Sequence, residues 1–150
     1  MYILSKCHPV ENIVWDESGI IGMSRFLKKV ERLCKSVVHV RQGPKGLDER
    51  DETLKGQRVD VFEKYQSAME KRAFHNAISH LIKYTHSLTK YVKALVLKEG
   101  GISDTRVEDV EKSIHLLLLM LYPFATKMCR RLLDDGLFET RTFSDFMQDD

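Results

Sequence analysis

The chain has 150 residues, of which 43% are hydrophobic and 31% charged, and its 24 Lys and Arg against 22 Asp and Glu give a formal net charge of +2 at pH 7. This length suits one domain with its own core, and a nearly balanced charge neither requires nor excludes an anionic partner. Cys7, Cys34 and Cys129 are widely spaced and odd in number. They therefore argue against a disulfide framework and for a reducing compartment, with buried and inert thiols.

The N-terminal segment, from Met1 to about Trp15, predicts an extended lead-in. Tyr2–Leu4 is β-prone, and the His8-Pro9 pair disfavours helix. The segment lacks a basic region followed by a long apolar run, and it has no Arg and is not Ser-rich. We therefore expect neither a secretory signal nor a transit peptide.

A helix is predicted from about Ser18 to His39, because apolar residues recur there with a period of 3.6 residues. Its apolar positions are Ile20, Met23, Phe26, Leu27, Val30, Leu33, Cys34, Val37 and Val38. Glycine costs a helix interior about 1 kcal/mol relative to alanine. Gly19 and Gly22 are therefore expected at a tight junction beside the Trp15 ring and not in mid-helix. The ordinary alternative is a helix-entry loop with Trp15 as a lid over the core.

A linker is predicted from about Arg41 to Gly56, where Pro, Gly and charged residues leave little to bury. A long helical region in two parts follows. Asp60 and Glu63 form a capping-box pattern for its first part, and the apolar period restarts at Phe74. The glycines of the 98–101 stretch are expected to end it.

The last predicted helix opens with a second capping-box pattern, Thr105 with Glu108. Leu116–Tyr122 is apolar on every side, so it should lie at the centre of the molecule. Pro123 should kink this helix. The run Ser113–Ala125 is too short to span a bilayer, which needs about 20 apolar residues, so no membrane association is expected. The expected buried positions of this last helix are Val107, Val110, Ile114, Leu117, Leu118, Leu121, Phe124, Met128 and Leu132.

These segments predict an all-α bundle of about four helices with a short N-terminal extended segment. The predicted domain covers residues 1–135, and residues 136–150 form an acidic tail that we expect to be flexible.

Residues with catalytic or metal-binding chemistry form no recognisable set. No phosphate-cradling glycine loop is present. His75, His80 and His86 are five and six residues apart, so they do not share a helix face as a metal pair would. We therefore predict no catalytic residue, no metal site and no cofactor in this chain.

Three blocks of the sequence resemble leucyl-tRNA synthetases, class I enzymes, of the bacterial and mitochondrial type. Asn12–Leu33 resembles a Trp, Gly-x-x-Gly, Arg-Phe-Leu signature, with Trp15, Asp16, Gly19, Gly22, Arg25, Phe26 and Leu27. Ala73–Leu88 resembles a Phe-Asn-x-Ala-Ile helix, with Phe74 and Asn76 around an inserted His75. Leu116–Leu132 resembles a Leu-rich helix that runs into Pro-Phe-Ala, with Pro123, but Thr126, Lys127, Arg130 and Arg131 replace the Pro-His and acidic residues that follow in the family.

The resemblance covers nearly the whole chain and implies the α-helical anticodon-binding domain that follows the catalytic core of these enzymes. In the leucine enzymes this domain grips the tRNA body and does not rely on the anticodon. The resemblance implies leucine-accepting tRNA and the remainder of a synthetase as partners. It places ATP and Mg only in the full-length enzyme. It implies the mitochondrial matrix, otherwise the cytoplasm, and not secretion.

The hypothesis for tRNA contact rests on basic residues along the polar sides of the helices, because contacts to phosphates carry most nucleic-acid affinity. The candidates are Arg25, Lys28, Lys29, Arg32, Lys83, Lys90, Lys93, Arg130 and Arg131. The ordinary alternative is a solvated amphipathic face. A different functional alternative is a degenerate stand-alone helical module that binds protein through Thr126–Leu133 or the acidic tail.

Overall fold

The computed structural model describes residues 1–6, 17–42, 52–97 and 103–134. These ranges form six helices: α1 (Tyr2–Lys6), α2 (Glu17–Gln42), α3 (Glu52–Glu70), α4 (Phe74–Val96), α5 (Asp104–Leu121) and α6 (Thr126–Asp134). No strand occurs within them, which confirms the all-α prediction. Trp15, the glycines of 98–101 and the predicted tail lie outside the described residues.

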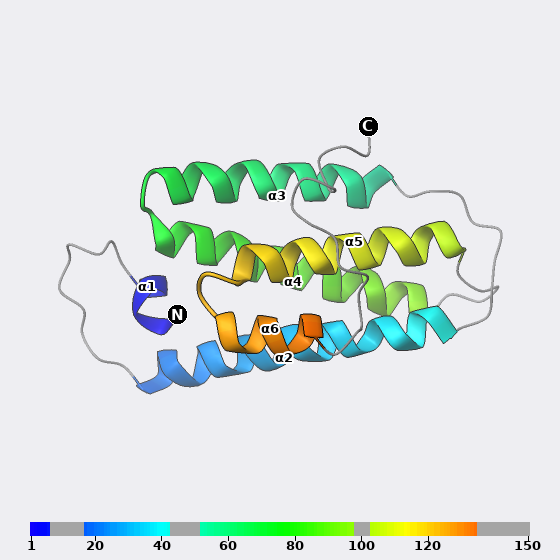
Figure 1. Ribbon diagram of the computed structural model, residues 1–150, viewed down its shortest axis with the longest axis horizontal. Helices are drawn as coiled ribbons and strands as arrows, with labels where there is room; N and C mark the ends of the chain where they lie inside the picture. The colour runs from blue at the N-terminus through cyan, green and yellow to red at the C-terminus, as the bar shows by residue number, and fades with distance from the viewer. Residues whose placement is uncertain (7–16, 43–51, 98–102, 135–150) are drawn as a thin grey trace.

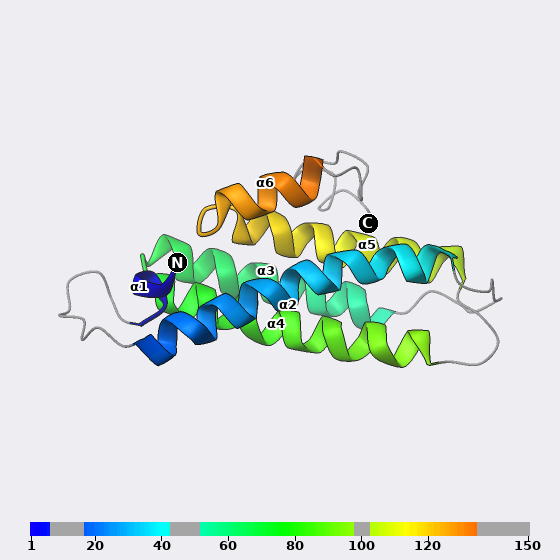
Figure 2. The same ribbon diagram turned by 90° about the horizontal axis from the view of Figure 1, so that it is seen from below.

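Four long helices form an elongated bundle, in which α2 and α4 run in one direction and α3 and α5 in the other (Figure 1). Helices α4 and α5 each pack against both α2 and α3. The short helix α6 packs against α5, and Figure 2 shows α6 and α4 on opposite sides of α2. Surfaces carried by α4 and by α6 therefore face different directions.

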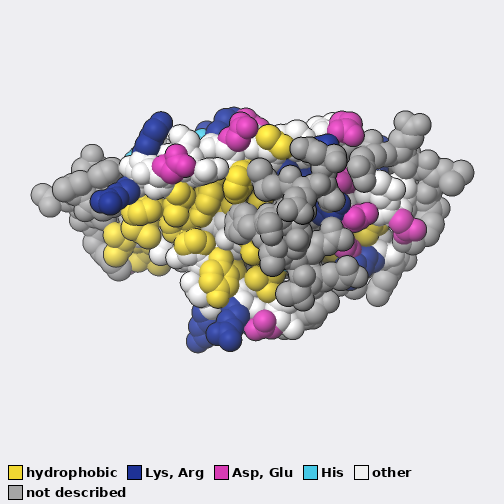
Figure 3. Space-filling model, turned by 45° about the horizontal axis from the view of Figure 1, so that its top comes forward, with side chains coloured by type: hydrophobic (Ala, Val, Ile, Leu, Met, Phe, Trp, Pro, Cys, Tyr) yellow, Lys and Arg dark blue, Asp and Glu magenta, His cyan; other side chains and the backbone are white. Residues whose placement is uncertain are grey.

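The core draws apolar side chains from all four long helices, and the predicted apolar faces point into it. Leu117, Leu118 and Leu121 are fully buried in α5, which confirms the central position of this stretch up to Leu121, whereas Tyr122 is 38% exposed. Figure 3 shows that apolar side chains also reach the surface at one end of the bundle, next to basic side chains. Phe124 and Met128 lie at the edge of the core and are only half-buried.

The N-terminal segment is helical and not extended, so that part of the fold prediction is wrong. Residues 2–6 form α1, which packs against α4 and α2. The Ser5 hydroxyl donates a hydrogen bond to the Tyr2 carbonyl oxygen (2.6 Å). Tertiary packing thus overrides the weak β-propensity of these residues.

Gly19 and Gly22 lie within the first two turns of α2, so the prediction of a tight junction there is also wrong. Gly19 lets α1 come close. A Cβ there would overlap the Tyr2 ring and lie 2.8 Å from Lys6 Cε, whereas a Cβ at Gly22 meets nothing within 4 Å. Glycine is therefore required by packing at the first position only.

Gly22→Ala should raise the free energy of unfolding by about 0.5–1 kcal/mol, because alanine is the better helix former and its Cβ meets open space. Gly19→Ala should lose this gain, since the Tyr2 ring must move. Urea denaturation followed by circular dichroism measures both. Equal stabilisation by the two alanines would contradict the packing of α1 against Gly19.

Helix α3 begins at Glu52, within the predicted linker. Asp60 is therefore no cap; it lies inside the helix, where it accepts a hydrogen bond from Lys64 Nζ (2.7 Å). An acid and a base four residues apart stabilise a helix interior. Asp60 therefore forms an ion pair within α3, although its spacing to Glu63 also fits a capping box. Helix α2 likewise extends to Gln42, past the expected end at His39.

The break between α3 and α4 falls where the apolar period restarts, as predicted. Arg72 has a left-handed backbone with φ 54°. The Ala73 amide donates to the Ala68 carbonyl oxygen (2.8 Å) and the Arg72 amide to that of Met69 (3.0 Å). This is the Schellman pattern that ends a helix, here without its usual glycine.

Helix α5 has its cap two residues before the predicted one. Ser103 Oγ accepts a hydrogen bond from the Arg106 amide (3.3 Å), so Ser103 and not Thr105 is the N-cap. Pro123 lies in the turn after α5 and does not kink the helix. Helix α5 ends at Leu121, and α6 starts at Thr126. The chain turns there because Pro123 has no backbone N–H to continue the helix, and its exposed position tolerates the turn.

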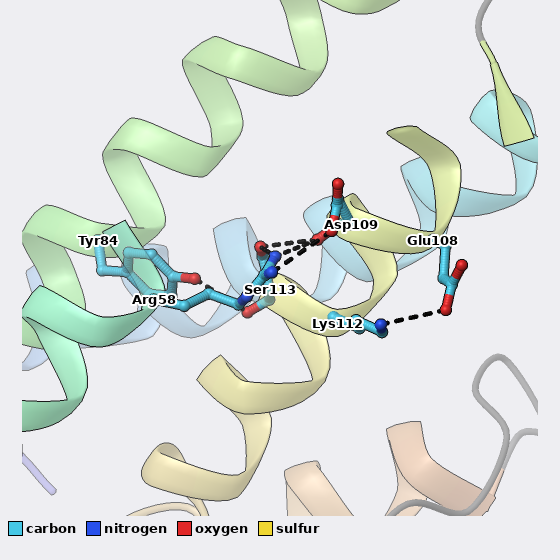
Figure 4. A network of polar contacts seen from close by, with 6 residues as sticks. All are labelled: Arg58, Tyr84, Glu108, Asp109, Lys112 and Ser113. Carbon is cyan, nitrogen blue, oxygen red and sulfur yellow. Dashed lines mark hydrogen bonds and ion pairs between the residues drawn. The ribbon is translucent and has the colours of Figure 1, made fainter. Parts of the chain in front are cut away.

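A buried polar network joins α3, α4 and α5 (Figure 4). Arg58 donates hydrogen bonds to the Asp109 carbonyl oxygen (3.1 Å) and Ser113 Oγ (3.1 Å), and its Nη2 lies 3.3 Å from Asp109 Oδ1. The Tyr84 hydroxyl donates to the Ser113 carbonyl oxygen (3.4 Å), and burial raises the pKa of Tyr84 above its usual range. The network therefore fixes three helices relative to one another.

Candidate nucleic-acid interface

A groove of about 530 Å³ lies between α2 and α4. It is lined by Gly22, Arg25, Phe26, Lys29, Ile82, Lys83 and His86. Three of these side chains, Arg25, Lys29 and Lys83, belong to the predicted basic set. The fold thus brings together cations that are more than 50 residues apart in the sequence.

Helical spacing sets the direction of the basic side chains. Lys83, His86, Lys90 and Lys93 are separated by three, four and three residues, so they share one face of α4. Leu81 and Leu88 face the core from the same helix. The four basic residues of α2 follow an equivalent pattern of three and four: Arg25, Lys28, Lys29 and Arg32. Each helix therefore presents a basic stripe opposite its buried side.

One hydrogen bond joins the two helices across the groove. Lys29 Nζ lies 3.0 Å from His86 Nδ1. Because an ammonium group can only donate, Nδ1 must accept, and the neutral ring then carries its proton on Nε2. Beneath this pair, Phe26 is buried in the core, while Ile82 stays 39% exposed. The groove thus combines an apolar floor with a basic rim.

The rim is electropositive because its cations have no acidic partner in the described part of the chain. No carboxylate of the described residues makes an ion pair with Arg25, Lys29 or Lys83. Arg131, by contrast, pairs with Glu31 (3.1 Å), and Arg130 lies 3.8 Å from Asp134. Uncompensated charge of one sign in a concave site attracts anions.

The predicted basic residues therefore do not form one surface. Lys28, Arg32, Lys90 and Lys93 are exposed on the two helices that form the groove but do not line it. Arg130 and Arg131 lie on α6, on the other side of α2 from α4 (Figure 2). The first group extends the groove's basic rim, whereas the α6 pair faces elsewhere.

Known proteins similar to this chain are leucine–tRNA ligases of bacteria. No protein-family model matches the chain. It is 31% identical over 137 residues to the leucine–tRNA ligase of Trichormus variabilis, which covers 88% of this chain and 14% of that protein. It is 29% identical over 138 residues to that of Ruthia magnifica, covering 88% of this chain and 16% of that protein. The match to the ligase of Wigglesworthia glossinidia brevipalpis is 24% over 135 residues, 86% of this chain and 15% of that protein.

The chain is homologous to one small part of the leucine–tRNA ligases. It spans between 14% and 16% of the length of these curated relatives. This confirms the resemblance inferred from the three sequence blocks. The relatives do not favour the alternative of a degenerate protein-binding module.

The other residues of the sequence blocks that resemble leucine–tRNA ligases lie near the turn between α3 and α4 or contact residues there. Phe74, at the start of α4, meets Phe124 edge to face, with ring centroids 6.4 Å apart. Pro123 lies in the turn beside Phe124. Asn76 is exposed and borders a second groove, of about 350 Å³, between α3 and α4. These motif residues thus shape the end of the bundle where α3 turns into α4.

The α3–α4 side also holds polar residues that the sequence did not single out. Lys64 and His80 line the groove that contains Asn76 and an adjoining one of about 280 Å³, which Lys83 borders. Burial, with help from Lys83 and Lys64, lowers the pKa of His80 below its usual 6.5. This histidine is therefore neutral at physiological pH.

Sequence reasoning missed Ile82 and His86 as groove residues. The spacing of four residues on α4 placed both on the exposed side. Nothing in the sequence paired them with Gly22, Arg25 and Lys29 of α2. Among the described residues there is no group of three or more His, Cys, Asp or Glu that could hold a metal ion. No described helix is long and apolar enough to cross a membrane.

Cys34 and Cys129 are fully buried, and burial raises the pKa of each thiol from 9.0 to about 12. The stability that this contributes is complete below about pH 9 and is lost as the pH rises toward 12. Cys7 lies outside the described residues. In a Cys7→Ser variant, iodoacetamide at about pH 8 should therefore modify neither remaining thiol until denaturant is added. Mass spectrometry measures this, and rapid labelling of the folded protein would contradict the burial.

Proposed function

We propose that this chain is a tRNA-binding helical module of leucine–tRNA ligase, of the anticodon-binding-domain type. In this proposal the α2–α4 groove contacts RNA phosphates through Arg25, Lys29 and Lys83, and Lys28, Arg32, Lys90 and Lys93 extend the contact along the two helices. The observation that supports the proposal is the convergence on one concave site of three cations, from two helices, that make no ion pair with the described residues. The chain is homologous to part of leucine–tRNA ligases, so we take tRNA as the anion that binds in this groove.

Attachment of leucine to tRNA is proposed only for a complete ligase. The remainder of the enzyme would bind ATP and Mg and form the leucyl adenylate. The part described here would hold the tRNA body, so that its partners are a leucine-accepting tRNA and the rest of the synthetase. Placement in the mitochondrial matrix rests on the bacterial-type resemblance, and fractionation of cells that express a tagged chain would test it.

A filter-binding titration of the chain with a leucine-accepting tRNA transcript tests the tRNA contact. Each phosphate contact adds about −0.7 to −0.9 to the slope of log affinity against log salt concentration. The three groove contacts should therefore contribute about −2 to −3 to the slope, and contacts by Lys28, Arg32, Lys90 and Lys93 would add to it. A transcript that accepts another amino acid reports whether binding is specific. A flat response to salt would refute the proposed contact.

A further inference from the structure

The α2–α4 groove has a chemistry that simple attraction to phosphates does not explain. Its floor is apolar, formed by Phe26 and the exposed part of Ile82. Its rim is cationic, formed by Arg25, Lys29 and Lys83. Phosphates would interact with the cationic rim alone, and the apolar floor would add nothing to that interaction. The expected occupant therefore carries an apolar face and a negative charge close together.

The groove is open at Gly22, since a Cβ there would meet nothing within 4 Å. Ile82 is 39% exposed, so it offers apolar surface to an occupant of the groove. Covering it would remove apolar surface from water, and the hydrophobic effect would favour that contact.

His86 adds a directed hydrogen-bond donor. Because Lys29 Nζ occupies Nδ1, the proton of the neutral ring lies on Nε2, the nitrogen that this hydrogen bond leaves unused. Nε2–H can donate to a carbonyl oxygen of a base or to a phosphate oxygen. The Lys29–His86 hydrogen bond therefore fixes the tautomer that an oxygen acceptor requires.

We infer that the α2–α4 groove takes an unpaired nucleotide of RNA, whose base covers Ile82 and whose phosphate contacts the cationic rim. This inference rests on the proposed function and names the form of RNA that the groove prefers. In a duplex the base faces are stacked and only the backbone meets a protein surface, so a paired stem would leave Ile82 in water. An unstacked nucleotide presents the base face and the phosphate together, which matches the floor and the rim.

Three RNA hairpins of one stem and loop sequence test the inference. The first is fully paired, the second has one bulged nucleotide in the stem, and the third has an abasic residue at the bulge. Fluorescence anisotropy at fixed salt measures their affinities for the chain. The bulged hairpin should bind about fourfold more tightly than the other two, which corresponds to roughly one methylene group of Ile82 removed from water.

Two sets of variants separate the floor and the donor from the rim. Ile82→Ser should abolish the preference for the bulged hairpin over the paired one. Val59→Ser is the matched control, because Val59 is 52% exposed on α3 and does not line the groove. His86→Gln keeps an acceptor for Lys29 and a donor, so it should keep the preference, whereas His86→Leu should lose it.

The outcomes distinguish this inference from the proposed function. Equal affinity for all three hairpins, with a negative salt slope, overturns the inference and leaves the tRNA contact intact. Binding of none of them, together with no binding of tRNA, overturns both. Displacement of the bulged hairpin by a polyglutamate peptide of equal affinity would assign the groove to an acidic protein segment and would also overturn the inference.

Discussion

Replacement of Arg25, Lys29 and Lys83 together by glutamine should lower the affinity for leucine-accepting tRNA by about 100-fold. Each lost charged contact removes roughly 1 kcal/mol or more, and every 1.4 kcal/mol is a tenfold change. The slope of log affinity against log salt concentration should fall in magnitude by about 2 to 3. Filter binding at several salt concentrations measures both. All three side chains line the groove and make no ion pair with described residues, and glutamine at position 29 keeps a donor for His86 Nδ1, so the fold should be retained.

The matched control removes the same number of charges from α6. Lys127, Arg130 and Arg131 are exposed there, on the other side of α2 from α4. Their replacement by glutamine should change the affinity by less than about threefold, because they do not line the groove and Arg131 and Arg130 are already compensated by Glu31 and Asp134. Arg130 and Arg131 were candidates from the sequence. An equal loss in both triple variants would mean that net charge, and not the groove, governs binding.

Arg58→Met should destabilise the protein by about 3–5 kcal/mol, the usual cost of leaving one member of a buried ion pair without its partner. The Arg58 and Asp109 side chains are 14% and 5% exposed, and Asp109 Oδ2 already lacks a hydrogen-bond partner among the described residues. Without Arg58, the Asp109 carboxylate would lose its counter-charge inside the protein. Urea denaturation at neutral pH measures the loss.

Two further variants give this prediction its controls. Lys64→Met breaks the exposed pair with Asp60, whose side chains are 54% and 61% exposed, and should cost less than about 1 kcal/mol. Arg58→Met combined with Asp109→Leu removes both charges and should recover most of the stability. A single Arg58→Met variant as stable as Lys64→Met would show that the network contributes little.

The sequence predicted the helices well where apolar residues repeat over several turns. Val30, Leu33 and Leu117 are all in the core, as their spacing required. Helix ends were predicted less well, because local patterns have more than one reading. Asp60 with Glu63 fits a capping box, yet Asp60 pairs with Lys64 inside α3. Ser103 caps α5 although Thr105 fits the motif better.

The errors near the N-terminus arise from tertiary contacts. Tyr2–Leu4 has β-prone composition, but packing against α4 and against Gly19 of α2 supports a helix there. No local pattern indicates that a glycine in one helix makes room for a tyrosine from another. For the same reason, the sequence read Gly19 and Gly22 as a turn.

The candidate site was predicted in its residue types but not in its assembly. Lys83 and Arg25 were chosen because they lie on polar helix faces. Spacing alone could not show that these faces meet, that Ile82 lies between them, or that α6 points elsewhere. These facts depend on how α2 packs against α4, which is set by buried contacts and not by the exposed residues themselves.

The two sides of the groove come from segments 57 residues apart, joined by the Lys29–His86 hydrogen bond. The groove therefore exists only while α2 and α4 are both docked in the bundle. Any molecule that fills it binds the native state alone, and thermodynamic linkage then requires it to protect the protein against unfolding. At a concentration 100 times its dissociation constant, the molecule should raise the free energy of unfolding by about 2.7 kcal/mol. The total stability of a small domain is only about 5–15 kcal/mol.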